Sequence, residues 1–195
     1  MTETLRDAER VQVKLFAEGE APKPLDLIPV FHRWIQDDVV KDELLVDVAD
    51  YSHVPQGPGV LLVGHGADWY YDQGEGRPGL LFSRKRAFEG DLRARLRDAF
   101  RQALEAAKRL QDDPTTGLRF GTSELLVRVP DRLHAPNTDA AFTALAPLVA
   151  EVAGELFGGE VKVERADSGR GGPLAARVHV PPGVELDALP TPVEA

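Results

Sequence analysis

Apolar and polar residues alternate in several short stretches of the chain, which is typical of β-strands with one buried face. Residues 11–19 (VQVKLFAEG) show this alternation and end at a glycine, and residues 121–129 (GTSELLVRV) repeat it. Residues 43–51 are almost continuously apolar, which predicts a central strand. Two further patterns predict hairpins: VLLVGHGADWYYD followed across QGEGRP by GLLFSRK, and EVKVERAD followed across SGRGGP by LAARVHV.

Helical spacing of apolar residues marks three other segments. The first covers residues 26–36, where Asp26 can cap the helix and Pro29 falls in the first turn. The second, residues 91–111, has the clearest apolar stripe, and the third covers residues 137–157. Because Pro147 lies inside the third stripe, we expect a kink or two short helices there.

The resulting order of elements is β-α-β-β-β-α-β-α-β-β. It predicts an α+β fold in which a mixed β-sheet carries the helices mainly on one face. The strand, helix and strand within residues 11–51 predict a right-handed crossover between two parallel strands. We expect a single α+β domain over residues 1–182 and a proline-rich flexible tail over residues 183–195.

Composition and charge narrow the classes of function. The chain has 195 residues, 43% of them hydrophobic and 28% charged, which suits one globular domain. Its 23 Lys and Arg against 32 Asp and Glu give a net charge of −9, which opposes binding to nucleic acid or to an anionic membrane. The absence of cysteine excludes disulfides, thiolate metal sites and cysteine nucleophiles.

The start of the chain carries charges throughout and no apolar core, so it predicts neither a signal peptide nor a transit sequence. No apolar run approaches the ~20 residues that cross a bilayer. We therefore expect no membrane association and a cytoplasmic location.

The segments FHRWIQ, DVADYSHVPQGPGVLLVGH and GLLFSRKR resemble parts of an uncharacterised bacterial protein family of about this length. The similarity covers most of the chain apart from the tail. Because no activity, cofactor or catalytic residue is established for that family, the resemblance implies only one compact bacterial domain.

Basic residues gather in one part of this acidic chain. Residues 84–109 hold nine basic and four acidic residues, and Arg93, Arg97 and Arg101 recur at i, i+4 and i+8 along the predicted helix. Guanidinium groups bind carboxylates and phosphates in a two-pronged way. The alternative interpretation is a solvated helix face paired with acids elsewhere in the chain.

Our leading hypothesis is a non-catalytic binding or adaptor domain for an acidic protein partner or a small anionic ligand. Aromatic residues of the hairpin would supply contact area and basic residues would orient the partner. The residues predicted to bind are Trp69, Tyr70, Tyr71, Arg77, Arg84, Lys85, Arg86, Arg93, Arg97 and Arg101.

A second hypothesis is a small hydrolase or acid–base enzyme with its site around His65. Gly64 and Gly66 leave space beside an imidazole that titrates near neutral pH, and Asp68 or Asp47 could assist it. The alternative is a packed, structural histidine. A third hypothesis is a homo-oligomeric structural component that pairs through an exposed hairpin edge.

Other motifs predict neither a cofactor nor a metal. Gly74, Gly76 and Gly79 match G-x-G-x-x-G, but a strand-like segment follows them where the dinucleotide motif requires a helix. A metal site would have to gather histidines from three separate elements, at positions 32, 53 and 65. The SGRGGP segment around Arg170 could surround an anion, although we assign it to a hairpin loop.

Overall fold

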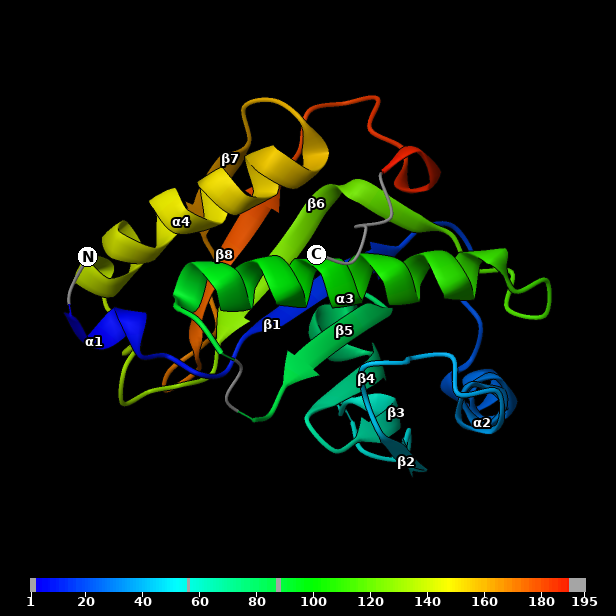
Figure 1. The fold of residues 1–195 in the computed structure, drawn as a ribbon. Helices are drawn as coiled ribbons and strands as arrows, with labels where there is room; N and C mark the ends of the chain where they lie inside the picture. Colours follow the sequence, from blue (N-terminus) through cyan, green and yellow to red (C-terminus); the bar gives the residue numbers. More distant parts are fainter. Residues whose placement is uncertain (1–2, 56, 87–88, 190–195) are drawn as a thin grey trace.

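The computed structural model describes residues 3–55, 57–86 and 89–189 (Figure 1). These residues build one eight-stranded sheet in which every pair of neighbouring strands is antiparallel. In spatial order the strands are β2 (Leu45–Tyr51), β3 (Gly59–Gly64), β4 (Ala67–Asp72), β5 (Gly79–Arg84), β1 (Gln12–Ala17), β6 (Phe120–Val129), β8 (Leu174–His179) and β7 (Lys162–Arg165).

The helices lie on one face of this sheet (Figure 1). The long helices α3 (Leu92–Asp112) and α4 (Asp139–Phe157) pack against each other, while α2 (Ile28–Gln36) packs beside β2 and α1 (Glu3–Arg6) contacts α4. Three short 3₁₀ turns complete the described elements: η1 (Pro24–Leu27), η2 (Gly74–Gly76) and η3 (Leu186–Ala188). The predicted α+β class, with helices mainly on one face, is confirmed.

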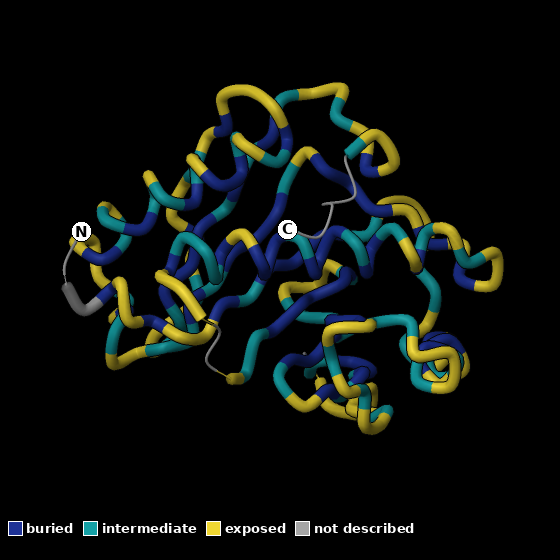
Figure 2. Tube along the Cα trace, viewed as in Figure 1, coloured by how far each residue is buried: buried dark blue, intermediate teal, exposed yellow. Residues whose placement is uncertain are grey.

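Strand alternation sends one set of side chains into the core and the other to the opposite face. In β1, Val13 and Leu15 join the main core, where they share a cluster with Phe100 of α3 and Val149 of α4. Figure 2 shows the buried segments running through the middle of the sheet and along the helices, with exposed segments in the loops and at the β2 end. The core therefore lies between the sheet and its helices.

The sheet is antiparallel throughout, where we expected a mixed one. β1 and β2 do run in the same direction, but β3, β4 and β5 lie between them. After β2 the chain returns towards β1 through consecutive antiparallel pairings. The local pairings of this meander replace the direct parallel pairing that the strand–helix–strand order suggested.

The structure divides one predicted strand into two. β3 ends at Gly64 and β4 begins at Ala67, so His65 and Gly66 form the turn between them. A Cβ atom at Gly64 would overlap the carbonyl oxygen of Ala67, so the close backbone approach at this reversal requires glycine. The expectation that His65 lies inside a strand is therefore wrong.

Helix α4 is a single helix with Pro147 inside it, and not two short helices. Thr138 caps its start by accepting a hydrogen bond from the N–H of Ala141 at 3.2 Å. By length and composition alone α4 is apolar enough to cross a membrane, with a mean hydropathy of 1.5. It packs against β7, β8 and α3, however, as part of an α+β domain of the soluble type.

Part of the expected flexible tail is packed against the domain. Leu186 is buried, and the hydroxyl of Thr122 donates to the carbonyl of Val184. Gln111 of α3 donates to the carboxylate of Asp187 at 3.1 Å. The expected looseness is therefore wrong for residues 184–189, and residues 190–195 lie outside the described part of the chain.

Candidate functional site

The predicted arginine ridge lies on one side of α3, but acidic side chains neutralise it. Arg93 and Arg97 both pair with Glu155 of α4, Arg97 at 2.7 Å. Arg101 pairs with Glu105 on the next turn of its own helix at 3.3 Å. Arg93 and Arg97 thus help to hold α3 against α4, and the prediction that the ridge presents free positive charge to a partner is wrong.

Two of the three predicted contact aromatics are in the core. Trp69 and Tyr71 are 1% and 0% exposed, the indole packs edge-on to Phe82, and the Tyr71 hydroxyl donates to the carbonyl of Pro22 at 3.0 Å. Tyr70 points to the other face of the sheet and is half-buried. Trp69 and Tyr71 therefore cannot offer surface to a partner.

Most of the basic side chains of the hairpin are also ion-paired. The pairs are Arg77–Glu124, Arg84–Asp98 and Lys85–Asp68. The guanidinium of Arg77 also lies 3.6 Å from the ring centroid of Phe16 on β1, a cation–π contact. Arg86 is exposed at the end of the hairpin. These charges chiefly anchor the hairpin to its neighbours.

Within the described residues, no hydrogen bond or ion pair joins the His65 imidazole to a carboxylate. It is exposed in the β3–β4 turn, whereas Asp68 is buried and pairs with Lys85 at 2.7 Å. Asp47 lies on the edge strand β2 and accepts a hydrogen bond from the N–H of Val48. The three residues of the predicted catalytic site therefore make no dyad.

The space beside the two glycines is filled by Glu43. The N–H of Gly66 donates to Oε1 of Glu43 at 2.6 Å, and Oε2 lies 3.6 Å from the guanidinium of Arg84. The glycines thus permit a close structural contact at the place where we expected an open site.

The three histidines considered as metal ligands lie on separate elements, and the glycine-rich stretch forms a turn and the start of a strand. His32 is exposed on α2 and His53 stacks on Tyr51 after β2. In residues 3–55, 57–86 and 89–189, no three His, Asp or Glu side chains are grouped as metal ligands. Gly74 and Gly76 belong to the 3₁₀ turn η2 and Gly79 begins β5, so no α-helix starts in the glycine-rich stretch.

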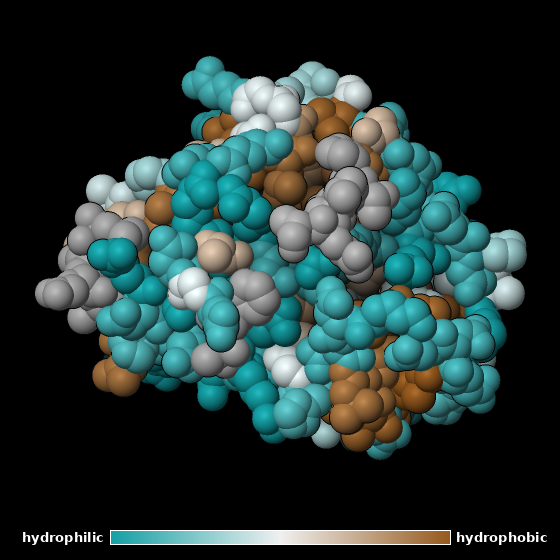
Figure 3. All heavy atoms as spheres, in the orientation of Figure 1, coloured by the Kyte–Doolittle hydropathy of each residue, from teal (hydrophilic) through white to brown (hydrophobic). Residues whose placement is uncertain are grey.

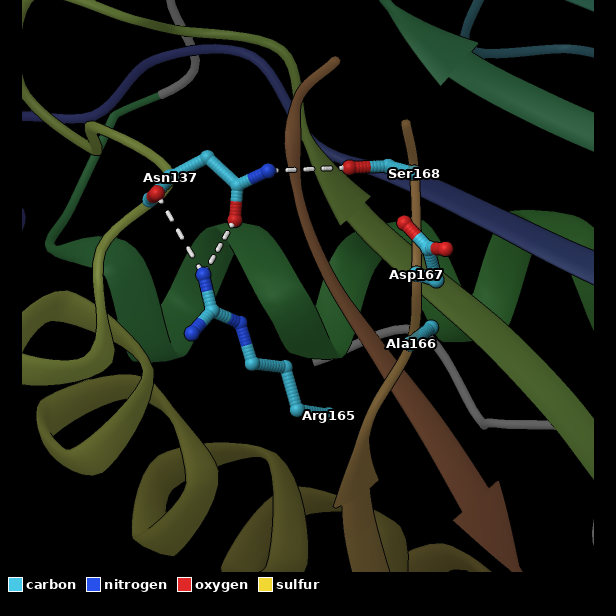
Figure 4. A pocket seen from close by; sticks show the side chains of 5 residues that line it. All are labelled: Asn137, Arg165, Ala166, Asp167 and Ser168. Atoms are coloured by element: carbon cyan, nitrogen blue, oxygen red, sulfur yellow. Dashed lines mark hydrogen bonds between the residues drawn. The ribbon is translucent and has the colours of Figure 1, made fainter. Parts of the chain in front are cut away.

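A surface cavity is present where the β6–α4 loop meets the β7–β8 loop (Figure 4). It consists of two hollows of about 250 and 420 Å³ that share Asn137. We call it the arginine cavity; its walls are Arg132, Pro136, Asn137, Arg165, Ala166, Asp167, Ser168, Gly169, Arg170, Gly171 and Gly172.

Asn137 joins the two loops that form the arginine cavity. Its amide nitrogen donates to Oγ of Ser168 at 3.0 Å, while its Oδ1 accepts from the guanidinium of Arg165 at 2.8 Å. In Figure 4 its side chain lies between these two partners. The Ser168 hydroxyl in turn donates to the carbonyl of Pro173 at 2.6 Å. The wall is therefore fixed by hydrogen bonds on both sides.

Glycine is required where the β7–β8 loop turns back on itself. A Cβ atom at Gly172 would overlap the carbonyl oxygen of Ser168, and Gly171 has a φ of +80°. This tight turn places Arg170 at the rim of the larger hollow.

Positive charge is unbalanced at the arginine cavity. Within the described part of the chain, Arg132 and Arg170 have no acidic partner, whereas Arg165 pairs with Asp139. The larger hollow contains both unpaired arginines and no acidic residue in its wall. Two guanidinium groups facing one hollow can hold a phosphate or carboxylate by paired hydrogen bonds.

The same β6–α4 loop holds an Asp–His pair. Nδ1 of His134 lies 3.0 Å from Oδ2 of Asp131. Burial alone would raise the pKa of Asp131, but hydrogen bonds from the N–H of Glu9 and from His134 hold that pKa below its ordinary value. Asp131 therefore stays ionised and orients the imidazole.

The sequence indicated only one side of the arginine cavity. The SGRGGP segment is a hairpin loop, as expected, and also forms a wall. Arg132 and Asn137 come more than thirty residues earlier, in a loop rich in turn-forming residues that carried no motif. Only the antiparallel pairing of β6 with β8 brings the two loops together.

The chain matches no protein-family model and no curated protein, and its fold matches no solved structure. The resemblance to a bacterial family therefore stays a prediction.

Proposed function

We propose that this chain is a cytoplasmic, non-catalytic binding domain that holds a small anionic ligand in the arginine cavity. One observation carries the proposal: Arg132 and Arg170, both without an acidic partner in the described residues, line one hollow of about 420 Å³. In a protein of net charge −9, most of the other described lysines and arginines are paired or bonded to backbone oxygens.

The size of the hollow supports a small molecule as the ligand. Ligand sites commonly enclose about 300–1,000 Å³. A phosphorylated or polycarboxylate compound would bring oxygen acceptors that match the guanidinium forks of both arginines. Asn137 and the neighbouring backbone would then set the position of its polar groups.

Binding suits the cavity better than catalysis does. The Ser168 hydroxyl, which could have served as a nucleophile, already donates to a backbone carbonyl and accepts from Asn137. Among the described contacts, no histidine bonds to that hydroxyl. The proposal keeps the anionic ligand expected from the sequence and moves its site from the α3 ridge to the arginine cavity.

The test uses inorganic phosphate, pyrophosphate and citrate as probes at constant ionic strength. We expect saturable chemical-shift changes in the backbone amides of residues 168–172 on titration with at least one probe. Arg132→Gln and Arg170→Gln should each weaken that binding at least fivefold. Arg109→Gln is the matched control, because Arg109 is exposed on α3 and has no partner in the described residues.

Equal affinities for the wild type and both cavity variants would contradict the proposal. So would shifts spread over the α3–α4 surface and absent from the β7–β8 loop. Shifts over the α3–α4 surface would place the anionic ligand on the predicted ridge, whereas equal affinities would show that the two cavity arginines do not bind it.

A second candidate function, acid–base catalysis, is favoured by the Asp131–His134 pair. The carboxylate holds Nδ1 and leaves Nε2 of the imidazole available for proton transfer, close in the chain to Arg132. The test is hydrolysis of p-nitrophenyl phosphate between pH 5 and 9. Activity that His134→Asn removes, with phosphate binding retained, would support it; no turnover by the wild type would exclude it for this substrate class.

A further inference from the structure

The edge strand β2 carries an exposed apolar surface. Four of the six large apolar side chains exposed in the described residues lie on or beside it: Leu44 (70% exposed), Val46 (58%), Tyr51 (45%) and Val54 (40%). Figure 3 shows apolar side chains gathered at the bottom of the view, where Figure 1 places β2. Such a cluster is commonly an interaction site in a soluble domain.

A bulge explains part of this exposure. The register of β2 against β3 shifts between Leu45 and Asp47, so Val46 is the extra residue and has no partner on β3. Leu45 packs against the core, whereas Val46 remains in solvent. The sequence thus places a valine where the folded strand cannot bury it.

The surroundings of this apolar surface are strongly acidic. Residues 37–54 contain six acidic residues, of which Asp38 pairs with Lys41, Asp42 with Arg101 and Glu43 with Arg84. Asp37, Asp47 and Asp50 form no ion pair within the described residues. Asp47 and Asp50 belong to β2 itself, and both are exposed. A complementary partner therefore has to bring positive charge as well as apolar side chains.

The two aspartates also argue against a second copy of this chain. Oδ1 of Asp47 accepts from the N–H of Val48 at 2.7 Å, and Oδ1 of Asp50 accepts from the N–H of Ser52 at 2.8 Å. Antiparallel pairing of two β2 edges would bring the carboxylates of both copies together without a countercharge. Charged residues and bulges on an edge are known to oppose self-association in this way.

We propose that the β2 surface, defined as Leu44, Val46, Asp47, Asp50, Tyr51 and Val54, docks a basic, partly apolar extended segment of a partner protein. Its apolar residues cover Leu44 and Val46, and its lysines or arginines pair with Asp47 and Asp50. This docking is independent of the arginine cavity, which lies at the opposite end of the sheet, beside β7 and β8.

The experiment selects binding segments from a displayed library of random eight-residue peptides on the intact protein. We expect the enriched peptides to combine apolar residues with lysine or arginine. Synthetic copies should bind at least tenfold more weakly to Leu44→Ser/Val46→Ser and to Asp47→Asn/Asp50→Asn. Added salt should weaken their binding to the wild type.

Matched controls distinguish binding at this surface from nonspecific apolar or electrostatic binding elsewhere on the protein. Leu133→Ser removes another highly exposed leucine (81% exposed), and Glu160→Gln removes an exposed acid far from β2, so both should bind the peptides as the wild type does. Enrichment of acidic peptides, no enrichment, or unchanged binding to the β2 variants would each overturn the proposal. A wild-type dimer in sedimentation that Val46→Ser dissociates would also overturn it, because the occupant would then be a second copy.

Discussion

The ammonium nitrogen of Lys14 lies 2.5 Å from Oδ2 of Asp72, and the Lys14 side chain is completely buried on the sheet face opposite the helices. The ammonium also donates to the carbonyl of Gly74 at 3.0 Å, so the β4–β5 loop closes over it. Burial lowers the pKa of Lys14, while the charge of Asp72 opposes that shift. Each member of this pair is tolerated inside the protein only because the other is present.

Breaking the Lys14–Asp72 pair should therefore cost much of the stability. We expect Lys14→Met to lower the free energy of unfolding by about 3–5 kcal/mol, since it leaves a buried carboxylate without a partner. The double variant Lys14→Met/Asp72→Leu should lose clearly less than the sum of the single variants. Urea denaturation of the four proteins measures this coupling, and additive losses would show that the two charges act independently.

Tyr71 should make the protein sensitive to alkali. Burial, helped by the charge of Asp26, raises the pKa of Tyr71 to about 12 from 10.0. Between those two values the unfolded chain loses the proton first, so the stability contributed by Tyr71 is complete below pH 10 and falls as pH rises towards 12. Tyr71→Phe should be about 1 kcal/mol less stable than the wild type at pH 8, because it loses the hydrogen bond to Pro22. That gap should narrow by pH 11 in guanidinium denaturation; a constant gap would contradict the raised pKa.

Glu124 should stabilise the protein more at neutral pH than in acid. Burial alone would raise its pKa, but the guanidinium groups of Arg77 and Arg177, each 2.5 Å from its Oε1, hold that pKa below the ordinary value. Its contribution is therefore present above pH 4.5 and is lost as pH falls through the folded-state pKa. We expect Glu124→Gln to lose about 1 kcal/mol at pH 7 and a smaller amount at pH 3. Glu160→Gln, an exposed control, should change little at either pH, and equal losses for Glu124→Gln at both would refute the lowered pKa.

Phosphate should raise the melting temperature if the arginine cavity binds it. At ten times its Kd a ligand adds about 1.4 kcal/mol, which corresponds to about 3–6 °C for a chain of this length. The comparison is with sodium chloride at equal ionic strength. The general salting effect of phosphate should remain in Arg132→Gln/Arg170→Gln, while the additional rise should vanish; an undiminished rise would place binding elsewhere.

Elements in which the apolar residues keep one regular spacing from end to end were predictable from the sequence. The apolar stripe of α3 predicted residues 91–111, and the helix is Leu92–Asp112 with Asp91 as its cap. The β3–β4 turn was missed because apolar residues on one side and three aromatics on the other continue a strand-like pattern through Gly64. A two-residue reversal leaves little trace in a pattern that is read over longer windows.

The candidate sites were harder to predict because they depend on partners distant in the sequence. Helical spacing correctly aligned Arg93 with Arg97, yet their acidic partners, Glu151 and Glu155, come from another helix. Arg132 and Arg170 have no such partner in the described residues, but nothing in their local sequence marks this difference. Which cations are neutralised is decided by tertiary packing.

The central position of β1 has a consequence for biosynthesis. Residues 12–17 leave the ribosome early, but their two neighbours, β5 and β6, end only at residues 84 and 129. Until both have been synthesised, the backbone around Val13 and Leu15 lacks a neighbouring strand on at least one side. Nascent chains that end before β6 should consequently remain open to chaperones and proteases, and the centre of the sheet should assemble only after β6 has emerged.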